Sequence, residues 1–160
     1  MRPAQHPTAL RNAQLLRLAD ILTDVVEFEQ PVRTSAEAAV AIGCSVAEIA
    51  KSIVFRGQTS GLAVMVVASG DNRVSEAKVA ALAGEGLGRA DADFVRAATG
   101  YAIGGVAPFG HAQPCRVLLD EELQRFSAVW AAAGTPYSVV PLSPAQLQRL
   151  TGAPWSDVKA

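Results

Sequence analysis

The residues with the clearest chemical potential are one lysine and one glycine-rich loop. Lys51 stands just before the apolar segment 53–56, and residues 99–111 read T-G-Y-A-I-G-G-V-A-P-F-G-H. Glycine allows positive φ angles and a close approach to bare backbone, whereas proline fixes one dihedral and removes a donor. We therefore expect the loop to present main-chain N–H groups to a ligand; the alternative is a tight, buried connection between two core elements. A lysine ammonium beside main-chain donors suits an anionic or ester ligand.

The role of Lys51 depends on where its strand begins. If the strand includes residue 51, the alternation of side chains puts Lys51 on the same face as Ile53 and Phe55. An ammonium on an apolar face is costly unless it is paired or faces a cavity. If the strand begins later, Lys51 extends its charged end into solvent from the strand edge. With only the alternation of side chains as a guide, we favour the second interpretation.

Two further titratable residues lie near these segments. His111 closes the loop beside Pro108 and Phe109, where a histidine is more often a hydrogen-bonded structural residue than a general base. Asp71 follows Gly70 in a predicted turn at the end of a buried strand, where sites in α/β-type sheets often lie. For its neighbour Asn72, a solvated turn is the simpler interpretation.

Composition and motifs argue against several other kinds of site. The two cysteines, Cys44 and Cys115, show no metal-ligand spacing, and His6 and His111 are the only histidines, so we expect no metal and no cofactor. No nucleophile elbow, P-loop or dinucleotide fingerprint is present. The net charge is −1 and the cations are dispersed, so a nucleic-acid partner would be held only by a short end or with affinity supplied by another protein.

No apolar run approaches the roughly 18 to 20 residues of a membrane helix, and no secretory signal precedes residue 8. These features predict a cytoplasmic protein without a membrane partner.

The pattern of elements predicts one α+β domain over residues 1–160. We expect helices at 8–22, 34–43, 75–83, 91–98, 120–126 and 143–152, and strands at 25–28, 53–56, 62–68, 116–119 and 137–140. Leu10, Leu15, Leu18 and Leu22 define the apolar face of the first helix. Segment 62–68 is apolar on both faces and should be central in its sheet. Because the order lacks a strict βαβ rhythm, we expect a mixed, largely antiparallel twisted sheet surrounded by helices.

Taken in order, five segments resemble the YbaK/prolyl-tRNA editing family of aminoacyl-tRNA deacylases. They are V-R-T-S-A-E-A-A at 32–39, I-A-K-S-I-V-F at 49–55, S-G-D-N-R-V at 69–74, the segment 91–111 and R-L-T-G at 149–152. The sharpest parts are the lysine-bearing strand and the G-x-x-x-P loop from Gly104 to Pro108. Each motif is weak alone, but their order and spacing together are specific, and the resemblance covers nearly the whole chain.

The resemblance implies hydrolysis of the ester that joins a wrong amino acid to the 3′ end of a transfer RNA. It gives Lys51 a role in holding the terminal phosphate or ribose region. It assigns Gly104, Gly105 and the loop through Val106, Ala107 and Pro108 to fixing the ester and the attacking group. His111 and Asp71 are candidates for lining the pocket, with no role carried over from the family.

The resemblance also implies the partners, which are the acceptor end of an aminoacylated tRNA and an aminoacyl-tRNA synthetase. Branches of this family that are specialised for cysteinyl-tRNA carry a different glycine loop. This difference favours alanine, serine or threonine as the amino acid that this chain would remove. A non-catalytic module that captures aminoacylated RNA ends, and hydrolysis of a small non-RNA ester or amide, are the alternatives. The sequence leaves the oligomeric state open between a monomer and a homodimer.

Overall fold

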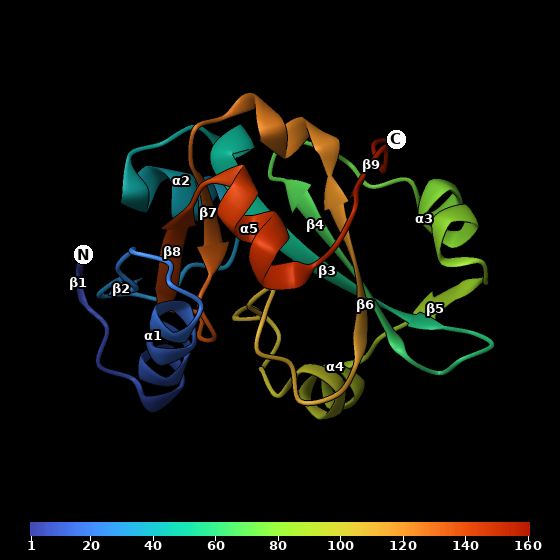
Figure 1. The fold of residues 1–160 in the computed structure, drawn as a ribbon, viewed down its shortest axis with the longest axis horizontal. Coiled ribbons are helices and arrows are strands. Elements are labelled where there is room, and N and C mark those ends of the chain that lie inside the picture. Colours follow the sequence, from blue (N-terminus) through green and yellow to red (C-terminus); the bar gives the residue numbers. More distant parts are fainter.

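A single nine-stranded sheet organises the chain in the computed structural model, which describes residues 1–160 (Figure 1). Its strand order is β1-β2-β8-β7-β3-β4-β6-β9, and β5 also pairs with β3. The strands are β1 (Arg2–Pro3), β2 (Val26–Glu27), β3 (Ile49–Gly57), β4 (Ala63–Ser69), β5 (Leu87–Arg89), β6 (Cys115–Asp120), β7 (Val129–Ala132), β8 (Ser138–Leu142) and β9 (Trp155–Ser156).

Antiparallel pairs predominate in this sheet. The β3·β7, β4·β6 and β6·β9 pairs are parallel and the other five are antiparallel. The prediction of a single α+β domain with a mixed, largely antiparallel sheet is therefore confirmed. All seven residues of β4 are buried between β3 and β6, as the apolar pattern of segment 62–68 predicts.

Five α-helices pack around the sheet, and α5 lies across it in Figure 1. They are α1 (Pro7–Leu18), α2 (Ser35–Ile42), α3 (Glu76–Ala83), α4 (Ala92–Thr99) and α5 (Pro144–Thr151). Short 3₁₀ turns cover Val46–Glu48 and Glu121–Arg125. Both ends of α2 are capped, at the bounds predicted for this helix: Thr34 accepts from the N–H of Glu37, and Gly43 ends the helix in the left-handed conformation. No helix is both long and apolar enough to cross a membrane.

The predicted apolar face of α1 is wrong. Ala9, Asn12 and Leu16 are the buried residues of this helix, whereas Leu18 is exposed and Leu22 is 94% exposed. The helix ends at Leu18, and Asp20 adopts a positive φ of 58°, so Leu22 is not part of the helix at all. A polar residue, Asn12, faces the interior because its tertiary hydrogen bonds outweigh the leucine pattern.

The sequence pattern also missed β1, β5, β7 and β9, which are short, and it placed the start of β3 too late. Strand β3 begins at Ile49, and Lys51 lies within it opposite Ala68 of β4. The interpretation in which Lys51 precedes its strand is therefore wrong. The parallel pairing with β7 at Ile49 and Ala50 extends β3 backwards.

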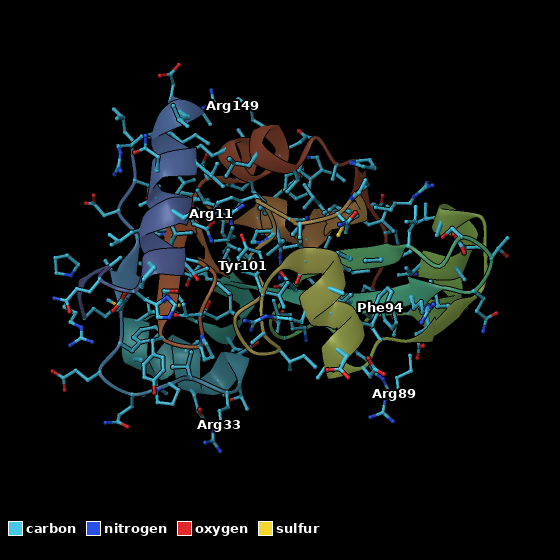
Figure 2. The ribbon with its side chains drawn as sticks, turned by 90° about the horizontal axis from the view of Figure 1, so that it is seen from below. Arg11, Arg33, Arg89, Phe94, Tyr101 and Arg149 are labelled. Atoms are coloured by element: carbon cyan, nitrogen blue, oxygen red, sulfur yellow. The ribbon has the colours of Figure 1, made fainter.

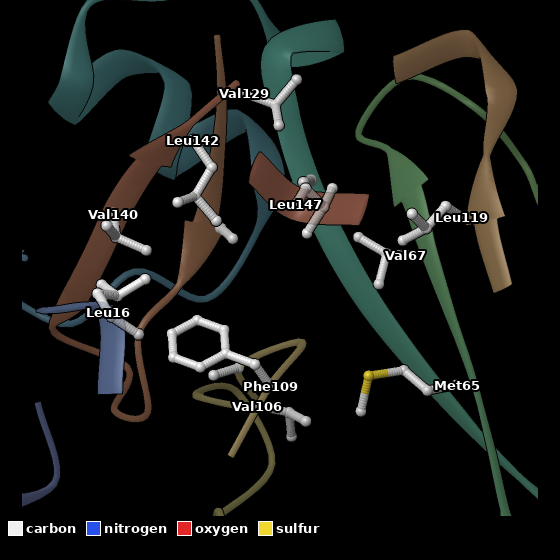
Figure 3. Close-up of a cluster of buried hydrophobic side chains, with 14 of the residues drawn as sticks. Leu16, Met65, Val67, Val106, Phe109, Leu119, Val129, Val140, Leu142 and Leu147 are labelled. Atoms are coloured by element: carbon white, nitrogen blue, oxygen red, sulfur yellow. The ribbon is translucent and has the colours of Figure 1, made fainter. Parts of the chain in front are cut away.

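The glycine-rich loop is fixed by its apolar side chains. Val106 and Phe109 belong to the main core cluster, and the ring of Phe109 lies beside Leu16 of α1 (Figure 3). Ala107 is also fully buried in this cluster. Residues 105–109 of the loop are thus part of the core, whereas residues 102–104 are exposed.

A buried hydroxyl ties the same loop to α1. The hydroxyl of Tyr101 lies 2.7 Å from the carbonyl oxygen of Phe109, to which it donates, and 3.1 Å from Oδ1 of Asn12. Nδ2 of Asn12 donates to the carbonyl of Ala133 at 2.8 Å. Arg11, which lies beside Tyr101 in Figure 2, donates to the carbonyl of Gly110 at 3.0 Å. This network joins the loop, α1 and the turn after β7.

Replacing Tyr101 by phenylalanine should lower the free energy of unfolding by about 1–3 kcal/mol, because buried acceptors lose their donor. Urea denaturation measures the change. Tyr137→Phe is the matched control, since Tyr137 is 41% exposed and its hydroxyl makes no hydrogen bond within the chain. Equal stabilities of the two variants would contradict the clamping role of Tyr101.

Candidate functional site

A cavity of about 190 Å³ opens between β3, the start of α2, the glycine-rich loop and the turn between β7 and β8. For scale, an apolar cavity of about 150 Å³ accommodates benzene. The cavity therefore has room for a small amino-acid side chain. Its walls are formed by Val32, Arg33, Thr34, Ser35, Ala38, Ile49, Ala50, Lys51, Ser52, Gly104, Val106, Trp130, Ala132, Thr135, Ser138 and Val139.

Lys51 supplies the cavity with a positive charge that no carboxylate neutralises. Its Nζ donates to the main-chain carbonyl of Asn72 at 2.7 Å and to that of Gly70 at 3.3 Å. No Asp or Glu oxygen lies within ion-pair distance of Lys51. Carbonyl oxygens fix the position of the ammonium but leave its net charge available to a ligand.

A buried carboxylate holds the carbonyl partners of Lys51 in place. Asp120 is fully buried, and its Oδ2 accepts from Nδ2 of Asn72 at 2.9 Å and from the N–H of Ser69 at 3.0 Å. Asn72 is only 5% exposed, so the expectation of a solvated turn is wrong at this residue. The side chain of Asn72 binds Asp120 while its carbonyl binds Lys51, which connects β6 to the charged group of the cavity.

The loop presents unpaired main-chain donors on the facing wall. Among residues 102–107 only Gly105 donates a main-chain hydrogen bond within the chain, to the carbonyl of Ala102 at 3.1 Å. The N–H groups of Gly104 and Val106, the two loop residues that line the cavity, have no partner in the chain, and Val106 is buried. Because buried N–H groups are nearly always paired, these donors are suited to an electron-rich ligand oxygen.

The two adjacent glycines of the loop are required for different reasons. Gly104 lines the cavity with φ of +95°, a conformation that side chains with a Cβ rarely adopt. A Cβ on Gly105 would lie 2.6 Å from main-chain atoms of Thr135. Gly104 thus allows the bend, and Gly105 allows the loop to pack against the turn after β7.

The predicted site residues do not all reach the cavity. Lys51, Gly104 and Val106 line it together, whereas Gly105, Ala107 and Pro108 lie behind the wall and position it. The roles of all six residues in catalysis or binding stay predictions.

The structure does not bring His111 and Asp71 to the cavity. Nε2 of His111 hydrogen-bonds to the carbonyl of Ala107 at 2.8 Å, so His111 braces the loop from within. Asp71 accepts from the hydroxyl of Ser69 at 3.0 Å and lies 3.7 Å from a guanidinium nitrogen of Arg125. Neither residue lines this cavity, and a role for them in substrate binding stays a prediction.

Sequence reasoning missed the hydroxyl-bearing residues of the walls. Thr34 was noticed only as a helix cap, and Thr135 and Ser138 lie in a turn that carried no motif. Ser52 could have been found from its position next to Lys51. No group of three His, Cys, Asp or Glu residues that could hold a metal ion is present.

Substituting alanine for Gly105 should lower the free energy of unfolding by about 1–3 kcal/mol, the usual cost of overpacking. Gly88→Ala is the control, because a Cβ there would make an ordinary 3.5 Å contact with the carbonyl oxygen of Arg56. Thermal unfolding compares the two. If Gly105→Ala is as stable as Gly88→Ala, the close packing of the loop on Thr135 is not required.

Burial lowers the pKa of His111, although its hydrogen bond to Ala107 acts in the opposite direction. The folded protein therefore favours the neutral imidazole, while an unfolded chain binds a proton at about pH 6.5. Stability from this residue is present above that pH and is lost as the pH falls below it. Between about pH 7.5 and 5.5, the wild type should lose more unfolding free energy than His111→Gln. Parallel losses in urea titrations would contradict the assignment.

Comparison with known proteins agrees with this geometry. Residues 29–150 match the family described as the aminoacyl-tRNA editing domain. A crystal structure of a proposed trans-editing enzyme for prolyl-tRNA synthetase is 40% identical, with a TM-score of 0.91 over 98% of this chain and 99% of that one. The hypothetical protein APE2540 is 29% identical, with a TM-score of 0.85 over 92% of this chain and 98% of that one.

Among curated proteins, the uncharacterized protein YwhH of Bacillus subtilis (strain 168) is 38% identical over 136 residues, which cover 84% of this chain and 86% of YwhH. Residues 29–150, which match the family model, include Lys51, the glycine-rich loop and every residue that lines the cavity. The chain belongs to the aminoacyl-tRNA editing domain family.

Proposed function

We propose that this protein is a trans-acting deacylase that hydrolyses the ester between a mischarged small amino acid and the 3′ end of a tRNA. The observation that carries the proposal is the cavity shared by an unneutralised lysine and a loop with unpaired main-chain donors. Membership of the editing-domain family supports the same substrate class.

The chemistry requires little beyond positioning and charge stabilisation. A water oxygen adds to the acyl carbon, and negative charge develops on the carbonyl oxygen. The intermediate then collapses, the bond to the ribose 3′-oxygen breaks, and a proton from the water ends on that oxygen. An aminoacyl ester is already activated, and its neighbouring 2′-hydroxyl can assist the proton transfer. Preorganised N–H donors at the loop stabilise the developing oxyanion, and no side-chain nucleophile is needed.

The walls and the net charge support a specific class of substrate and partner. About 190 Å³ of space bordered by Ala38, Ala50 and Ala132 suits alanine, serine or threonine. A net charge of −1 suits an enzyme that contacts only the acceptor end of the tRNA. The low net charge is also consistent with a synthetase partner that supplies further affinity for the tRNA.

Lys51→Ala should reduce deacylation by roughly 10²–10³-fold, the loss expected for one preorganised electrostatic contact, with the fold intact. The measurement is release of free amino acid from alanyl-, seryl-, threonyl- and cysteinyl-tRNA by purified protein. Lys159→Ala is the control, because Lys159 lies at the surface beside Glu122.

Unchanged turnover by a folded Lys51→Ala protein would remove Lys51 from the mechanism. Saturable binding of charged tRNA by the wild type without release of amino acid would instead indicate a non-catalytic binding module.

A further inference from the structure

The edge of β3 that faces the cavity has an interruption in its hydrogen bonding. Along this edge β7 pairs with Ile49 and Ala50, and β5 pairs with residues 55–57. Residues 51–54 have no strand partner on that side. The cavity lies at the start of this gap, where β3 and β7 separate.

The direction of the main-chain groups in the gap follows from the ladder with β4. The carbonyl of Ile49 accepts from Gly70, and the N–H of Gly57 donates to Leu62, so odd-numbered residues of β3 bond toward β4. Alternation then directs the N–H and C=O groups of Ser52 toward the opposite edge. Of the unpaired residues 51–54, Lys51 and Ser52 line the cavity.

The hydroxyl of Ser52 is also without a partner. Its Oγ is the only buried side-chain nitrogen or oxygen in the chain that makes no hydrogen bond. Other wall hydroxyls are satisfied: Oγ1 of Thr135 and Oγ of Ser138 lie 2.8 Å apart, and Oγ1 of Thr34 caps α2. A buried polar group left unpaired is destabilising, so this hydroxyl does not serve stability.

We propose that Ser52 contacts the substrate, its hydroxyl and main-chain N–H donating to the carbonyl oxygen of the aminoacyl ester. This inference rests on the proposed deacylase function and adds donors on the wall opposite the loop. An oxygen is the favoured partner because Ser52 offers two donors and lines the same cavity as Lys51, whose ammonium repels the cationic amino group of the substrate.

The test measures activity and stability of the same variants. Ser52→Ala should lower kcat for deacylation by about 10²-fold, with a smaller change in KM, because the oxyanion gains more from the donor than the ester does. Its melting temperature should equal or exceed that of the wild type, since an unpaired buried hydroxyl is removed. Ser138→Ala should instead melt at a lower temperature, because Ser138 accepts from the N–H of Thr135. Exposed Ser127→Ala is the activity control.

Three results would overturn the inference: wild-type kcat in Ser52→Ala, an equal fall of kcat in Ser127→Ala, or loss of activity accompanied by a lower melting temperature.

A binding measurement separates this inference from the proposed function. An RNA acceptor helix carrying 3′-amide-linked alanine keeps the carbonyl oxygen but resists hydrolysis. If the wild type binds this analogue but does not hydrolyse the aminoacyl ester of charged tRNA, the deacylase proposal fails. Weaker binding of the analogue by Ser52→Ala than by the wild type would still support the contact. Equal binding by both proteins removes it.

Discussion

The site depends on a local interruption of main-chain hydrogen bonding along β3. A strand in the middle of a sheet normally has both edges paired, and β3 is paired along its whole length with β4. On its other edge, pairing stops after Ala50 and resumes only at Phe55. Separation of β3 from β7 at this point creates the space that the glycine-rich loop and α2 then enclose. A continuous β3·β7 ladder would leave no room for a ligand beside Lys51.

Two buried polar networks hold the walls around that space. On one side, Tyr101 and Asn12 fasten the loop to α1 and to the turn after β7. On the other, Asp120 fixes Asn72, whose carbonyl holds the Lys51 ammonium. Both networks lie outside the cavity and act on it through main-chain atoms. The charged group and the loop donors are therefore preorganised before any substrate binds, which is the condition under which electrostatic stabilisation is most effective.

Local signals in the sequence predicted most of the fold. Thr34 places the start of α2 by a short-range hydrogen bond with Glu37, and the apolar run that becomes β4 identifies the centre of the sheet. Features set by long-range contacts were not predictable in this way. The buried face of α1 is chosen by the bond from Asn12 to Ala133, and the start of β3 by its pairing with β7. Lys51 and the loop were singled out by their residue types, and the resemblance to a family gave them roles, whereas Ser52 required knowledge of which hydroxyls have partners.

Main-chain groups supply most of the polar contacts of the site, and side chains supply its shape, which affects how the amino-acid preference of such a protein can change. Apart from Lys51, the polar groups that hold the ammonium and those offered by the loop belong to the peptide backbone, which no substitution removes. The shape of the space is set by separate side chains, among them Val32, Ala38, Trp130 and Val139. Under the proposed function, exchanging these residues would alter which acyl group fits, while the ammonium and the main-chain groups stay in place. A scaffold of this kind can acquire new amino-acid preferences by changes in contour alone.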